Sequence, residues 1–168
     1  LSWDLMVGNL HLSDGSKLLR SWAGATGEWW SSTESELWMG TTIAVYFATL
    51  DLDPTKFLVD IALHRGQHAL VEHVCKDQNF PDNYCHSLTQ NLNNTRALID
   101  YSWHPPIQQP WEVHLLPLVL PLITLRFIPT CSPLLLQELA EVARKYDCHI
   151  TSHISESIDK VEFSQHVD

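Results

Sequence analysis

The chain has 168 residues, 45% of them hydrophobic, and a formal net charge of −10 with its ten histidines counted as neutral. This length fits one domain, and the hydrophobic content excludes wholesale disorder. The acidic balance argues against binding to nucleic acid or to an anionic membrane, because both need clustered Lys and Arg. Histidines are as numerous as Lys and Arg together, which directs attention to metal or proton chemistry.

The cellular compartment is predicted from the leader and the cysteines. The chain shows no basic-then-apolar leader, and prolines and Arg126 interrupt its longest apolar stretch, residues 115–129. These features predict a soluble, cytoplasmic protein without a membrane span. The four cysteines include no C-x-x-C pair, so we expect free thiols rather than disulfides.

In the first half of the chain, the hydrophobic pattern becomes regular near residue 40. The first 40 residues hold five of the seven tryptophans and show no sustained period, so residues 1–37 are left as an unplaced, Trp-rich segment. Residues 43–49 form a β-branched and aromatic run that is typical of a buried strand. Asp53 followed by Pro54 predicts a helix N-cap there, and Gly66 is the expected end of that helix.

The second half repeats this pattern. Residues 68–75 are the next strand candidate, 77–86 are loop-like, and a weaker helical pattern begins at residue 88 and ends near 103. We expect a third strand around 122–127, after Pro121. Ser132 and Pro133 then repeat the cap-and-proline start of an amphipathic helix. Residues 148–154 are the fourth strand.

The resulting order is β-α-β-α-β-α-β, which predicts parallel βα units in a doubly wound sheet or a barrel. Four such strands are half of an eight-stranded barrel. A complete (β/α)₈ barrel takes about 250 residues, so 168 residues cannot form one. The domain prediction is therefore a partial barrel over residues 38–168.

The densest polar cluster accompanies the last predicted strand. Alternation places His149, Thr151 and His153 on one face, at the strand end where barrel active sites lie. His153 could bind a metal, with Glu156 as a general acid/base beside a metal-bound water. The alternative is a structural histidine hydrogen-bonded to the backbone.

Arg126 and Phe127 close the third predicted strand. A guanidinium and an aromatic face could grip a planar polar ligand. The alternative places Phe127 in the core and Arg126 in an ion pair. Among the other histidines, His64 and His68 are interpreted as surface groups around a helix end, and His73 and His86 as structural.

Four motifs in order resemble the guanine deaminase family of the amidohydrolase superfamily. Residues 40–49 (GTTIAVYFAT) resemble its GTTTACYFAT-type strand, and residues 74–79 (VCKDQN) resemble its VCMDLN-type segment. Residues 125–132 (LRFIPTCS) resemble its PRF…CS stretch, with Leu125 in place of proline, and residues 152–157 (SHISES) resemble its SHISEN stretch. The resemblance implies a zinc-dependent (β/α)₈ aminohydrolase that converts guanine and water to xanthine and ammonia in purine catabolism.

Transferred by position, the resemblance implies that His153 is a zinc ligand, Glu156 the acid/base, and Arg126 and Phe127 the residues that contact guanine. It also implies a homodimer with a small-molecule substrate. The family's H-x-H zinc motif is absent, and its later His and Asp ligands would lie beyond Asp168. We therefore expect this chain to be inactive in isolation. The alternatives are another amidohydrolase deaminase acting on a purine, pterin or triazine, and a non-catalytic fragment that associates with a full-length subunit.

Overall fold

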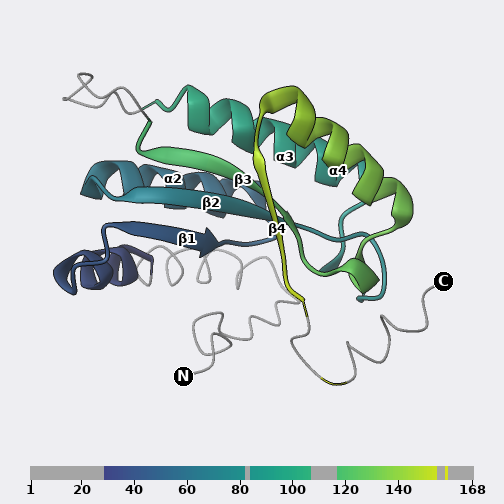
Figure 1. Ribbon diagram of the computed structural model, residues 1–168, viewed down its shortest axis with the longest axis horizontal. Helices are drawn as coiled ribbons and strands as arrows, with labels where there is room; N and C mark the ends of the chain where they lie inside the picture. The colour runs from purple at the N-terminus through teal and green to yellow at the C-terminus, as the bar shows by residue number, and fades with distance from the viewer. Residues whose placement is uncertain (1–28, 82–83, 107–116, 155–157, 159–168) are drawn as a thin grey trace, which may run out of the picture.

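The computed structural model describes residues 29–81, 84–106, 117–154 and 158, which form a sheet covered by helices (Figure 1). Residues 29–38 are helical. The elements that follow are β1 (Ile43–Phe47), α2 (Leu52–Arg65), β2 (His68–Cys75), α3 (Leu88–Trp103), β3 (Val119–Leu125), the 3₁₀ turn η3 (Ile128–Thr130), α4 (Pro133–Tyr146) and β4 (His149–Ser152). This is the alternation of strands and helices that the sequence predicts.

The four strands form one parallel sheet in the order β1-β2-β3-β4. Each strand therefore pairs with the next one along the chain, after a helical crossover. The sheet twists and curls, and α2, α3 and α4 follow its strands as the crossover helices (Figure 1). Because parallel crossovers share one hand, successive crossovers place these helices on the same side of the sheet.

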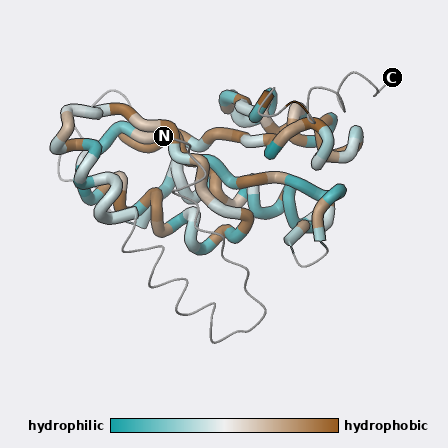
Figure 2. The backbone as a smooth tube through the Cα atoms, turned by 90° about the horizontal axis from the view of Figure 1, so that it is seen from below, coloured by the Kyte–Doolittle hydropathy of each residue, from teal (hydrophilic) through white to brown (hydrophobic). Residues whose placement is uncertain are grey.

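The helices bury one face of the sheet. On β2, Ala69 and Val71 pack in a core cluster with α2, and Cys75 packs in a second cluster with α3 and α4. Strand alternation directs the intervening residues Leu70, Glu72 and Val74 to the other face, which we call the inner face. In Figure 2 brown, hydrophobic stretches and teal, hydrophilic ones alternate along the described backbone, as expected for elements that bury one face and expose the other.

The N-caps of α4 and α2 test two of the helix starts that the sequence predicts. Ser132 caps α4 by accepting a hydrogen bond from Leu135 N at 3.2 Å, with Pro133 in the first turn, as predicted. The prediction of Asp53 as an N-cap is wrong. Helix α2 begins at Leu52 with Asp51 in the cap position, so Asp53 and Pro54 lie inside its first turn, where the missing proline N–H breaks no helical bond.

Four other elements differ from the sequence-based expectations. Residues 29–38 form a helix that their irregular hydrophobic pattern did not predict. Strand β3 begins at Val119 and includes Pro121, although we expected it to start after that proline. Strands β1 and β4 are each shorter than predicted. Strand β2, by contrast, has the predicted bounds of 68–75.

Three further findings concern the described residues. None of the four cysteines, all of which lie in the described residues, forms a disulfide, as predicted. Of the helices in the described part of the chain, none is both long enough and apolar enough to cross a lipid bilayer. His73 is structural, as predicted, because its buried Nε2 lies 2.9 Å from the carbonyl oxygen of Leu50.

Candidate functional site

Four side chains mark the carboxyl ends of the four strands on the inner face, and we call them the strand-end cluster. Phe47 is the last residue of β1, and Lys76, Arg126 and His153 directly follow β2, β3 and β4. The register supports this alignment, because Leu125 pairs with Ser152 and Arg126 N donates to Cys75 O at 3.1 Å. In parallel α/β barrels, this end of the strands carries the chemistry.

Phe47 brings two of the predicted site residues together. Its ring meets the His153 imidazole edge to face, with centroids 4.6 Å apart and planes at 82°. The guanidinium carbon of Arg126 lies 5.1 Å from the same ring centroid. The cation and the imidazole therefore share one aromatic support, which the sequence analysis did not identify.

Arg126 enters no ion pair with any residue in the described ranges, so the ion-pair alternative is not observed. Phe127 is half-buried and lies outside both core clusters. Its ring centroid is 6.4 Å from that of Phe80, with the planes at 64°. The core alternative for Phe127 is therefore not observed either, and both side chains lie at the end of β3.

The turn that follows Phe127 is tied to the loop after β2. The backbone N–H groups of Asp77 and Gln78 donate to Thr130 O at 3.0 and 3.2 Å. The Gln78 side-chain amide donates to the carbonyl oxygens of Pro129 and Cys131, each at 3.2 Å. These bonds fix the spacing between the loops that carry Lys76 and Arg126.

Asp77 also anchors the start of α4. Its Oδ1 accepts from Ser132 N at 2.7 Å, and its Oδ2 accepts from Ser132 Oγ at 2.6 Å. A carboxylate at a helix N-terminus is stabilised by the exposed N–H groups and by the helix dipole. Asp77 thus uses both oxygens for structure. Asp77 and Gln78 belong to the motif over residues 74–79, but their structural role depends on contacts with residues 129–132, far along the chain.

Lys76 is another residue that the sequence analysis missed. Its side chain is buried, and its Nζ lies 3.7 Å from the Phe80 ring centroid and 3.4 Å from that of Tyr84. Burial, followed by the nearby positive charge of Arg126, lowers the pKa of Lys76 to about 8. A lysine directly after a strand, with two aromatic residues in the next loop, is the signal that could have found it.

Glu72 lies deeper on the inner face, where it pairs in register with Phe47 on β1 and Leu122 on β3. It is 2% exposed, and within the described ranges its Oε2 has no hydrogen-bond partner. Burial raises the pKa of Glu72 to about 7, against a smaller lowering by Thr124. A carboxyl group in this state favours protonation near neutral pH.

The predicted metal site is only partly visible. His153 lies at the end of β4, whereas Glu156 lies outside the described residues. Within the described part of the chain, no three His, Cys, Asp or Glu side chains come together as a metal-binding group. Catalytic zinc sites use three or more protein ligands, so the residues described here do not by themselves fit a zinc ion.

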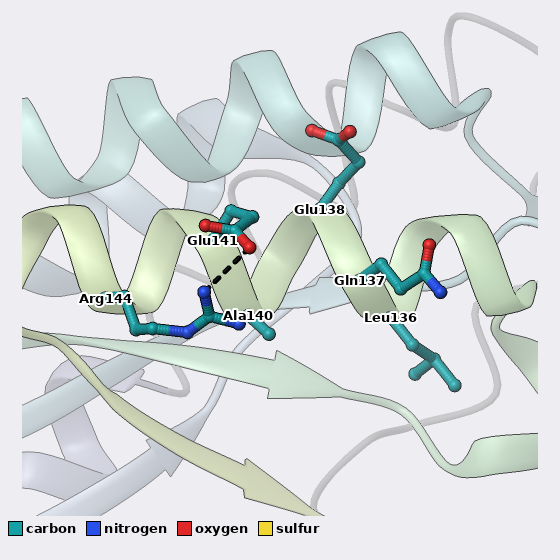
Figure 3. A pocket seen from close by; sticks show the side chains of 6 residues that line it. All are labelled: Leu136, Gln137, Glu138, Ala140, Glu141 and Arg144. Carbon is teal, nitrogen blue, oxygen red and sulfur yellow. Dashed lines mark hydrogen bonds and ion pairs between the residues drawn. The ribbon is translucent and has the colours of Figure 1, made fainter.

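A shallow surface hollow on α4 is separate from the strand ends. Leu136, Gln137, Glu138, Ala140, Glu141 and Arg144 line it (Figure 3). Arg144 donates to Glu141 Oε1 at 2.7 Å in an exposed i,i+3 pair, drawn as a dashed line in Figure 3. None of the predicted site residues contributes to this hollow.

Comparison with known proteins agrees with this geometry. No family profile matches the chain. The human guanine deaminase is 37% identical over 125 residues, which cover 73% of this chain and 25% of that protein. The crystal structure of the guanine deaminase from C. acetobutylicum with bound guanine has a TM-score of 0.74 and 30% identity, covering 86% of this chain and 33% of that one.

The fold is shared more widely. A zinc-complexed atrazine chlorohydrolase from Arthrobacter aurescens superposes with a TM-score of 0.67 at 18% identity, covering 84% of this chain and 32% of that one. The described residues therefore form consecutive βα units of a partial α/β barrel, as predicted. The chain is similar to guanine deaminases, and it spans about a quarter of the length of these curated relatives.

Proposed function

We propose that this chain is the purine-holding part of a guanine deaminase-like aminohydrolase. The observation that carries the proposal is the strand-end cluster, in which Arg126 and His153 share the Phe47 ring and Phe127 follows directly. The Arg126 guanidinium would donate hydrogen bonds to purine acceptors, and the Phe127 ring would cover the purine face. The support is the coincidence of this geometry with the guanine deaminase resemblance.

The remaining roles belong to the same proposal. His153 would supply one of several zinc ligands, and Glu156 would move protons between water and the leaving amine. When bound, the zinc would supply the activation of a water molecule. The proposal also includes that the protein acts in the cytosol, in purine catabolism, and as a homodimer.

Replacing Arg126 by alanine should weaken guanine binding about 10- to 100-fold, the value of a hydrogen bond to a charged group. Equilibrium dialysis with radiolabelled guanine measures this on the purified chain. Arg144→Ala is the matched control, because it removes an exposed arginine from α4, and it should leave the affinity unchanged. Competition by adenine, a pterin and a triazine identifies the ring that binds best. Equal affinity of wild type and R126A, or a stronger preference for another ring, contradicts the guanine-binding proposal.

Purified chain supplied with zinc should release no xanthine or ammonia from guanine above the buffer rate. The reason is that His153 is the only zinc ligand that the family resemblance assigns to this sequence, and the H-x-H motif is absent. A single imidazole holds zinc weakly compared with a three-ligand site. An absorbance assay for xanthine with an ammonia assay in parallel decides this. Turnover that depends on His153 would show that the site is completed in a way the motifs do not reveal.

A further inference from the structure

We propose that Lys76 is a positioning residue for Phe127, acting through the ring of Phe80. Its ammonium group is held between Phe80 and Tyr84, and Phe80 in turn contacts Phe127. The positioning rests on these contacts alone. Only its consequence for a bound purine rests on the proposed function.

The first step concerns the position of the Lys76 ammonium group between two aromatic rings. The Nζ of Lys76 lies 3.7 Å and 3.4 Å from the centroids of the two rings, well within the distance of about 6 Å at which a cation is attracted to an aromatic face. The centroids of Phe80 and Tyr84 are themselves 6.0 Å apart, with the planes inclined at 56°. The cation therefore connects two rings of the loop between β2 and α3.

The second step is that the Lys76 backbone is fixed, so its side chain can act as an anchor. Lys76 N donates to Asn91 Oδ1 at 3.3 Å, and Asn91 Nδ2 donates to Lys76 O at 3.0 Å. His86 N donates to the same carbonyl oxygen at 3.3 Å. Asn91 is a fully buried residue of α3. The lysine is thus attached to a rigid helix at its backbone and to the loop rings at its tip.

The third step leads from the loop to the candidate site. The rings of Phe80 and Phe127 meet at a centroid distance of 6.4 Å and an angle of 64°, within the range of edge-to-face aromatic pairs. The carbonyl oxygen of Phe127 accepts from Thr130 N at 3.0 Å and from Thr130 Oγ1 at 2.9 Å. The backbone of Phe127 is therefore set by the η3 turn, and Phe80 supports its ring.

A second cation close by works against the ammonium group of Lys76, whereas the two aromatic rings favour it. Arg126 is near enough to disfavour the protonated form of Lys76, and no ion pair with Lys76 occurs in the described ranges. Cys85 and the two aromatic faces counter this repulsion. A neutral side chain of similar length would fill the space without drawing the two rings together.

The test uses the full chain labelled with 4-fluorophenylalanine at its five phenylalanines, with the Phe127, Phe80 and Phe57 fluorine signals assigned by F127L, F80L and F57L. We expect Lys76→Met to shift both signals and to leave the signal of Phe57 on α2 in place. Lys76→Arg should restore the Phe127 signal, because a guanidinium also stacks on aromatic faces. Lys145→Met is the matched control, because Lys145 lies 5.1 Å from the Tyr146 ring on the exposed side of α4.

Guanine affinity gives the functional readout. It should fall about two- to fivefold in K76M and recover in K76R, as expected for the loss of a cation–π contact. If the wild-type chain does not bind guanine, the proposed function fails while the fluorine signals still test the positioning. An unmoved Phe127 signal in K76M overturns the positioning. If K76M does not fold, F80L takes its place, and an unchanged Phe127 signal in F80L has the same meaning.

Discussion

Replacing Leu135 by alanine is expected to lower the free energy of unfolding by about 2–5 kcal/mol, the cost of removing a large side chain from a packed core. Leu135 is completely buried in the cluster that joins α4 to α3 and to the sheet residues Cys75 and Ile123. It is also the residue whose N–H is capped by Ser132. The cavity left by the leucine side chain would therefore lie beneath the first turn of α4, which Asp77 anchors through Ser132.

Urea denaturation followed by circular dichroism measures the effect, with equal slopes confirming that both proteins unfold in the same way. The matched control is Leu134→Ala, one residue earlier on the same helix and 51% exposed. That change should stay within about 0.5 kcal/mol, as surface substitutions usually do. Equal losses in the two variants would mean that α4 does not pack on the sheet through the face described here.

The α4 region also shows why much of the fold could be predicted. Ser132 followed by Pro133 is a cap-and-proline pair that predicts the start of α4. The apolar residues Leu135, Leu139 and Val142 recur at helical spacing. Strand β2 and helix α3 also have the bounds that their residue patterns predict, although the helical pattern of α3 is weaker. Where the signal lies within a few residues of the element it defines, the sequence is sufficient.

The misread elements depend on contacts that are distant in the chain. The helix over residues 29–38 is held by Glu36, which accepts from Tyr46 Oη at 2.8 Å, and by Trp30, whose ring lies 3.9 Å from the Arg65 guanidinium carbon. Pro121 was read as a strand breaker. It precedes Leu122, where the pairing of β3 with β4 begins, so no ladder bond to β4 is lost there.

The residues of the candidate site also fall into two groups, those that a local sequence pattern predicts and those whose roles depend on distant contacts. Arg126, Phe127 and His153 could be predicted because each stands at the end of a recognisable strand or in a motif. Phe47 and Lys76 could not, because their roles come from rings on other elements. Phe47 supports Arg126 and His153 across the sheet, whereas Lys76 depends on a loop whose path no periodicity defines. Glu72 is likewise one of three polar residues in β2, and only the register places it on the inner face.

Glu72→Gln is expected to remove a pH dependence of stability worth about 3 kcal/mol between pH 4.5 and pH 7, because each pKa unit corresponds to 1.36 kcal/mol. The folded-state pKa of Glu72 is about 7, raised from 4.5 by burial. The folded state therefore holds the proton after the unfolded state has released it. The stability that this group contributes below pH 4.5 is lost as the pH rises through 7.

The measurement is the free energy of unfolding of wild type and E72Q at pH 5 and at pH 8. The glutamine amide is neutral at both values and close in shape to the protonated carboxyl, so the variant should gain stability over wild type chiefly at pH 8. Glu141→Gln is the control, because Glu141 is exposed and paired with Arg144 on the surface of α4. It should leave the pH dependence of the wild type within about 0.5 kcal/mol. If E72Q and wild type lose the same stability between the two pH values, Glu72 is ionised and hydrated in the folded state. The inner face beneath Phe47 would then be open to water rather than a buried floor of the candidate site.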